Sequence, residues 1–321
     1  MRPDDATKIN HRRHELRFDF PAHLRERSTM IHVLSFLFVF LWSTGFVAAT
    51  LVAPYSEPLA ILTLRFLGAA GLLLLFGLLA RGQWPTPRRA ARIMFSGALM
   101  HGVYLGCVFW GIKNGMPSGI SALLVGLQPI VTALLARPLL GEMIRPHHWL
   151  GLIIGLAGIA LVISPKFTLD PAGITPLTVG VHIIAILGMV LGSIFQKRFI
   201  GVMNFKTEPG IQMIGGLIIS APIALMSEGF SFIPAPQLFI GYAWMTVVLS
   251  CIAFSLYIYL LQQGEVSKVA SVFYLVPACS AIEGYLMFNE VLTPLQILGM
   301  TVTTLAVALS SDLFVKKQVI S

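Results

Sequence analysis

Two charged residues, Arg65 and Glu283, lie inside long apolar runs of the sequence. Arg65 is seven residues past Pro58 and Glu283 is seven residues short of Glu290, so in helices each lies about 10 Å from the end of its run. A buried guanidinium can hold a carboxylate through two parallel N–H donors, and a buried carboxylate can bind an amine or carry a proton. We therefore predict that both bind a substrate; the alternative is an ion pair that only joins two helices.

His101, Gln128 and three aromatic residues complete the predicted substrate-binding set. His101 could relay protons, because an imidazole exchanges them near neutral pH. It precedes a Gly-x-x-x-Gly pattern that permits close helix contact, so a packing role is the alternative. Trp42, Tyr104 and Tyr274 lie deep in apolar runs and could form flat walls for an apolar or aromatic ligand, whereas aromatic residues near the ends of runs are typical of a membrane interface.

A segment that begins at Gln128 is repeated 148 positions later. Six marker residues, Pro129, Ala133, Glu142, Pro146, Leu150 and Gly151, recur as Pro277, Ala281, Glu290, Pro294, Leu298 and Gly299. Each copy is an apolar run with a central proline, a glutamate thirteen residues later, a short turn and a second apolar run. Such self-similarity indicates a two-helix unit that occurs twice.

The prolines and glutamates of this repeat have different predicted roles. Pro129 and Pro277 are expected to kink their helices, because proline lacks an amide hydrogen and clashes with the carbonyl four residues before it. These kinks either bend as the protein works or are fixed by neighbouring helices. Glu142 and Glu290 end their runs, where an acid opposes the helix dipole. We therefore predict that these two form structural bonds at helix ends.

The elements that must position these residues are membrane-spanning helices. Hydrophobic residues make up 56% of the chain, charged residues only 11%, and the mean hydropathy is +0.82, which excludes a soluble surface. A span needs about 20 apolar residues. Ten segments qualify, at 31–53, 58–80, 93–112, 117–140, 148–164, 177–199, 209–226, 238–261, 269–288 and 295–314. The expected fold class is therefore an all-α integral membrane protein with ten transmembrane helices.

The net charge is +8, and the basic residues that produce it are unevenly distributed along the chain. Of the 22 basic residues, 19 fall in the N-terminal tail or in loops on one side of the ten spans. Basic loops stay cytoplasmic, so both termini are predicted to be inside the cell. The lipid bilayer is the expected partner of this surface, and no nucleic acid is expected.

Each half of the chain contains five predicted spans. An odd number forces the second copy to enter the membrane from the opposite side, so the halves are predicted to be inverted repeats around a central cavity. The predicted domains are a basic tail at 1–29, a first five-helix repeat at 30–166, a linker at 167–176, a second repeat at 177–315 and a short tail at 316–321.

The doubled motif resembles the EamA family of the drug/metabolite transporter superfamily. Leu127-x-Pro129 is followed by Gly141-Glu142, and Leu275-x-Pro277 by Asn289-Glu290; Trp42-Ser43-Thr44-Gly45-Phe46 and Leu64-Arg65-Phe66 fit the same pattern. The resemblance covers residues 31–314. It implies ten helices in two inverted five-helix repeats, and export, or less often import, of small metabolites such as amino acids.

We therefore predict a secondary transporter of a small polar or zwitterionic metabolite, working by alternating access at the cell's inner membrane and exporting its substrate. A proton is a candidate coupling ion. Span one contains no carboxylate, unlike that of the superfamily's small multidrug members, so Glu283 is the one deep acid for this role. No zinc helix or phosphate loop occurs, so no enzyme, cofactor or metal is expected. The alternative is a membrane sensor or binding protein that has lost transport.

Overall fold

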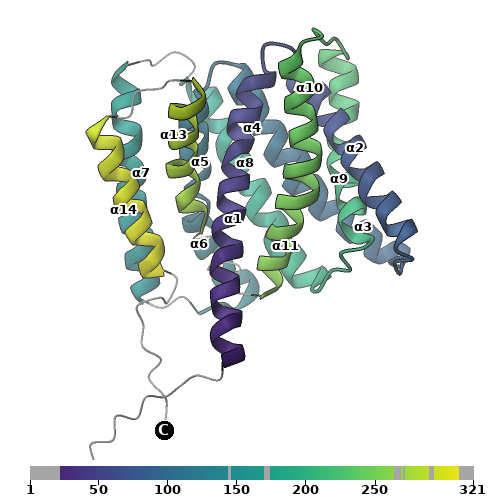
Figure 1. Cartoon of the computed structure of the whole chain (residues 1–321), viewed down its shortest axis with the longest axis horizontal. Helices are drawn as coiled ribbons and strands as arrows, with labels where there is room; N and C mark the ends of the chain where they lie inside the picture. Colours follow the sequence, from purple (N-terminus) through teal and green to yellow (C-terminus); the bar gives the residue numbers. More distant parts are fainter. Residues whose placement is uncertain are drawn as a thin grey trace, which may run out of the picture.

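The structure is a computed structural model that describes residues 22–143, 146–169, 174–263, 269, 272–288 and 293–310. Glu290 and most of both predicted tails lie outside the described residues. Helices account for nearly all of the described chain and pack side by side (Figure 1). In chain order they are α1 (Ala22–Val52), α2 (Pro58–Leu79), α3 (Pro87–Gly97), η1 (Ala98–Val103), α4 (Tyr104–Lys113), α5 (Ser118–Val125), α6 (Gln128–Leu140), α7 (Pro146–Leu169), α8 (Pro176–Phe195), η2 (Gln196–Ile200), α9 (Glu208–Ile223), η3 (Ala224–Glu228), α10 (Pro236–Ala243), η4 (Trp244–Ala253), α11 (Phe254–Gln263), η5 (Val272–Tyr274), α13 (Leu275–Phe288) and α14 (Pro294–Ser310).

Six helical stretches of the described chain are long and apolar enough to cross a membrane: Val33–Val52, Pro58–Leu79, Pro87–Lys113, Pro176–Ile200, Glu208–Glu228 and Pro236–Gln263. Four of them are composite, because the π-helical stretches η1 and η4 join α3 to α4 and α10 to α11, and η2 and η3 extend α8 and α9. The other four predicted spans coincide with shorter apolar helices. The all-helical membrane fold is thus confirmed, with six clear spans.

Pro129 and Pro277 both lie in the first turn of a helix. The predicted span at 117–140 is two helices, α5 and α6, separated at Gly126 and Leu127, and Pro129 is the second residue of α6. Pro277 is the third residue of α13, which follows the 3-10 turn η5. The first turn of a helix needs no amide donors from its own residues, so proline is tolerated there. Each proline therefore begins a helix after a break.

Helix α9 packs with its backbone close to α3 and η1. An added Cβ at Gly97 would clash with the carbonyl oxygen of Gln212, and one at Gly215 with that of Met94. Inside a membrane, lipid tails are as apolar as the helices, so close packing of small residues is what favours association. The glycines thus hold a helix of the second half directly against one of the first half.

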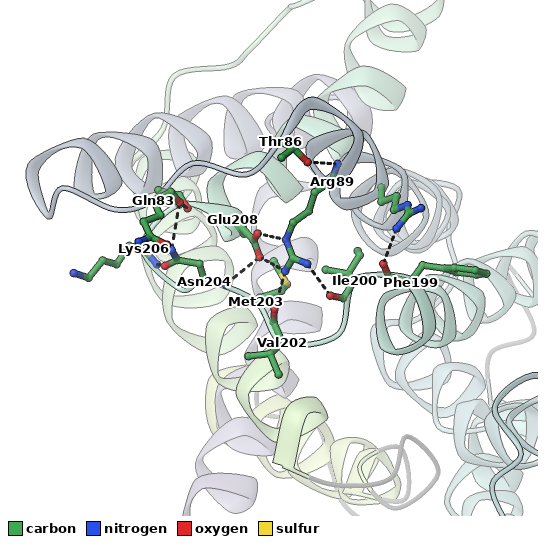
Figure 2. A network of polar contacts seen from close by, with 12 residues as sticks. Gln83, Thr86, Arg89, Phe199, Ile200, Val202, Met203, Asn204, Lys206 and Glu208 are labelled. Atoms are coloured by element: carbon green, nitrogen blue, oxygen red, sulfur yellow. Dashed lines mark hydrogen bonds and ion pairs between the residues drawn. The ribbon is translucent and has the colours of Figure 1, made fainter.

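A polar network joins α3 to α9 at one end of the bundle (Figure 2). It is formed by the first turns of these two helices and the loops that precede them. Arg89 forms an ion pair with Glu208 and donates to the carbonyl oxygens of Ile200, at 2.9 Å, and Val202, at 2.7 Å. The hydroxyl of Thr207 donates to the carbonyl of Gln83 at 2.8 Å. The Glu208 side chain is only 4% exposed and that of Arg89 is 34% exposed, so the carboxylate of this ion pair is shielded from solvent.

The opposite end is joined by weaker contacts. Lys113 lies 3.3 Å from Glu57, and these side chains are 31% and 37% exposed. The backbone amide of Ile233 donates to the carbonyl of Tyr55 at 2.9 Å. Glu228 accepts hydrogen bonds from the amides of Leu59 and Ala60 at the start of α2. Because an exposed ion pair is screened by water and salt, it contributes little.

We predict that Glu208→Gln loosens the network around Arg89. Amide hydrogen exchange in residues 80–86 and 201–207 should become roughly tenfold faster, because a hydrogen bond to a charged group contributes about 1.5–3 kcal/mol. Mass spectrometry of exchange in detergent measures the effect. Glu57→Gln is the matched control at the other end, where we expect less than a roughly threefold change in residues 53–57. Equal increases of the exchange rate in the two variants would contradict the conclusion that the Arg89–Glu208 contact is the stronger of the two.

Candidate functional site

A partly open pocket lies between α1, α2, α4 and η4. Most of its lining is aromatic or aliphatic, from Trp42, Gly45, Phe46, Tyr104, Leu105, Val108, Phe109 and Leu249. Arg65 is the charged residue of this lining, as far as the described chain shows. Pockets that bind small molecules are typically apolar with a few placed polar groups, and this one fits that description.

Arg65 is buried, with 5% of its surface exposed, and its Nε donates to Ser250 Oγ at 2.8 Å. Ser250 donates its own hydrogen to the carbonyl of Met245 at 3.0 Å, so its lone pairs are free to accept. Within the described chain, the two terminal guanidinium nitrogens of Arg65 have no hydrogen-bond partner and no carboxylate neutralises the charge. A buried cation without a counter-charge is costly. The terminal nitrogens of Arg65 are therefore free to bind an anion.

Glu283 is not among the residues that line the pocket. It is 8% exposed, and its Oε1 is 2.6 Å from Ser43 Oγ, while Oε2 has no partner among the described residues. Ser43 Oγ is also 2.9 Å from the carbonyl of Phe40. One hydroxyl hydrogen cannot serve two acceptors, whereas a proton on Glu283 would satisfy both contacts. Within the described chain no ion pair joins Arg65 to Glu283, and each hydrogen-bonds to a different serine.

An aromatic cluster lies against one side of the pocket. Phe38, Trp42, Tyr257 and Phe273 meet with ring centroids 5.2 to 5.8 Å apart. Trp42 also faces Tyr104, at 6.4 Å and nearly parallel. Because Phe38 precedes Trp42 by four residues on α1, their shared helix face was a sequence signal for this cluster; the contribution of Phe273 had no such signal.

His101 and Gln128 are buried outside the lining of the pocket. His101 is 3% exposed and packs between the rings of Phe66, at 5.7 Å, and Phe254, at 4.2 Å. Its Nε2 and the Oε1 of Gln128 have no hydrogen-bond partner within the described chain. Neither residue contacts Arg65 through a hydrogen bond, so the structure does not gather the predicted set into one site.

Tyr274 lies in a separate small cluster with Ala133, Leu152 and Ile159. It is fully buried, and its hydroxyl donates to the carbonyl of Leu152 at 3.1 Å. This bond joins η5, just before α13, to α7. Glu142 follows α6 and is half-buried, at the helix end where the sequence places it.

Both halves of the chain match the same family of known proteins. The sequence model of the EamA-like transporter family matches residues 29–164 and again residues 177–312. "Uncharacterized inner membrane transporter YedA" of Escherichia coli K12 is 28% identical over 298 residues, which cover 89% of this chain and 91% of YedA. "Probable amino-acid metabolite efflux pump", also of Escherichia coli K12, is 25% identical over 285 residues, which cover 83% of this chain and 90% of the pump.

A WAT1-related chloroplastic protein of Arabidopsis thaliana is 28% identical over 281 residues, and the match covers 84% of this chain but only 66% of that longer protein. Among solved structures, one crystal structure superposes with a TM-score of 0.73 at 19% identity, covering 88% of this chain and 99% of the other. At this identity the likeness supports the fold alone.

We predict that Tyr274→Phe destabilises the protein. The loss of its hydrogen bond to Leu152 should cost about 1 kcal/mol and lower the unfolding temperature by about 2 °C, measured by tryptophan fluorescence in detergent. Tyr285→Phe is the matched control, because Tyr285 is 51% exposed. An unchanged unfolding temperature in Tyr274→Phe would contradict this structural role.

Proposed function

Because the chain belongs to the EamA-like transporter family, we propose that it is a secondary carrier of a small metabolite. Transport would proceed by alternating access, with the two halves moving about a site between them. We place it in the inner, cytoplasmic membrane, as the printed name of the relative YedA suggests. The proposed direction is export, which follows the name of the "Probable amino-acid metabolite efflux pump".

The proposed architecture is ten transmembrane helices in two inverted five-helix repeats. Two observations support it: the family model matches once in each half, and six long spans are accompanied by four shorter apolar helices. The matched ranges, 29–164 and 177–312, also lie close to the predicted repeats at 30–166 and 177–315. The excess of basic residues on one side supports cytoplasmic termini.

The observation that carries the proposed function is the pocket with an unneutralised buried guanidinium. A carrier must bind its substrate in the middle of the membrane without a permanent internal partner for the binding group, and Arg65 meets this condition. We propose that Arg65 holds the substrate's carboxylate and that Trp42 and Tyr104 form walls. Amino acids and related carboxylates are the expected class of substrate.

A proton is the proposed coupling ion, and Glu283 its carrier. The support is the competition for the single hydroxyl hydrogen of Ser43, which a proton on Glu283 resolves. His101 and Gln128 have buried, unpartnered atoms, so a role in a second state of the carrier is proposed for them, in which the helices around them are rearranged. We propose that the Arg89–Glu208 network closes the end opposite Lys113 in one state of the carrier.

The test is transport by purified protein in liposomes loaded with labelled amino acids and related carboxylates. Arg65→Leu should lower the initial rate of exchange at least roughly tenfold, because one charge-assisted contact contributes about 1.5–3 kcal/mol. Arg88→Leu is the matched control, since Arg88 is exposed on α3. A normal rate in Arg65→Leu at normal reconstitution would remove Arg65 from the site.

Glu283→Gln separates coupling from binding. This variant cannot release a proton, so exchange of substrate should continue while accumulation driven by a pH gradient is lost. Accumulation and exchange are measured in the same liposomes. A pH-driven accumulation equal to that of the unaltered protein would show that Glu283 is not the proton carrier.

A further inference from the structure

The lining of the pocket has a charge imbalance that restricts its ligand. Arg65 supplies one positive charge, and within the described chain no aspartate or glutamate lines the same space. Glu283, the deep acid of the sequence, is held by Ser43. Neither Ser43 nor Glu283 is among the residues that line the pocket. The deep acid therefore lies outside the lining of the pocket.

An ammonium group would be poorly satisfied in this pocket. It has three N–H donors, but the side chains of the lining offer one neutral oxygen, on Tyr104. A contact with the aromatic faces of Trp42 or Tyr104 would contribute about 0.5–2 kcal/mol, while the positive charge of Arg65 in the same space repels a cation. Buried donors without acceptors cost about as much as such a contact gains.

A carboxylate, in contrast, supplies what the pocket lacks. The terminal nitrogens of Arg65 form a planar fork that matches two carboxylate oxygens. The remaining lining, which includes Phe46, Val108, Phe109 and Leu249, suits an apolar body. Such a body and one negative charge would together satisfy both the apolar walls and the guanidinium.

Resting on the proposed carrier function, we propose that the substrate is a monocarboxylate with an aromatic or similarly apolar body and no ammonium group. Amino acids are then poorer ligands than the corresponding acids without the amine. The selectivity comes from Arg65 and from the placement of Glu283 outside the pocket.

Three probes with the same phenylethyl body test this proposal: 3-phenylpropanoate carries a carboxylate only, phenylalanine a carboxylate and an ammonium, and phenethylamine an ammonium only. Their affinities for the purified full-length protein in lipid nanodiscs are measured by calorimetry at constant sodium chloride. We expect 3-phenylpropanoate to bind at least tenfold more tightly than phenylalanine, and phenethylamine not to bind.

Variants assign the effect to the pocket. Arg65→Gln should lose at least tenfold of the affinity for 3-phenylpropanoate, and Arg88→Gln should keep it. The three probes on the unaltered protein need no variant, so the order of affinities stands even if Arg65→Gln fails to fold. Phenylalanine binding as tightly as 3-phenylpropanoate, or no binding of any probe, overturns the proposal. So does a thermal stabilisation that sodium chloride alone produces and 3-phenylpropanoate does not increase, since the site then takes an inorganic anion only.

Liposome flux separates this proposal from the carrier function itself. Saturable exchange of phenylalanine that 3-phenylpropanoate does not inhibit would overturn the substrate class and leave the carrier intact. Binding in the expected order without flux of 3-phenylpropanoate would instead refute transport and support the anion site.

Discussion

The burial of one positive charge among apolar helices is the constraint on which the site depends. Removing a guanidinium from water costs several kcal/mol, and Arg65 recovers only part of this through Ser250. Ser250 lies in the π-helix η4, where its hydroxyl donates to the carbonyl of Met245, five residues earlier, and its lone pairs remain free to accept. Such π segments are rare and often occur at functional sites. The distorted helix of the second half thus supports the charge of the first half without neutralising it.

Hydropathy and the repeat predicted the helical membrane fold and the family. Both signals can be read directly from the order of residues in the sequence, without knowing which helices lie side by side. They also placed Arg65 and Glu283 at a similar depth, from which an ion pair was a reasonable hypothesis. Depth does not determine which face of a helix a residue occupies relative to helices far away in sequence. The two serine partners, and the burial of Tyr274 against α7, follow from lateral packing and had no signal in the spacing of residues.

The same sequence feature, a Glu-Pro pair at a helix start, occurs at both ends of the bundle, but the two glutamates differ in how far they are buried. Helices α2 and α9 both begin at a Glu-Pro pair, Glu57-Pro58 and Glu208-Pro209, at matching places in the proposed repeats. Glu208 is almost fully buried against Arg89, whereas Glu57 remains 37% exposed beside Lys113. Shielding from solvent strengthens an ion pair that keeps its hydrogen bonds. The carboxylate at the Glu208 end is therefore better shielded than the one at the Glu57 end.

The separation of the two buried charges gives α1 a central position in any coupling between them. If Arg65 and Glu283 formed an ion pair, the pair would cancel the attraction of Arg65 for an anion and would hold Glu283 ionised. Instead, Trp42 of α1 borders the pocket, and the next residue, Ser43, holds Glu283. In the proposed carrier, pocket occupancy and protonation of Glu283 act on the same helix. Coupling needs no contact between substrate and proton; it requires only that α1 has two positions and that each group favours one of them.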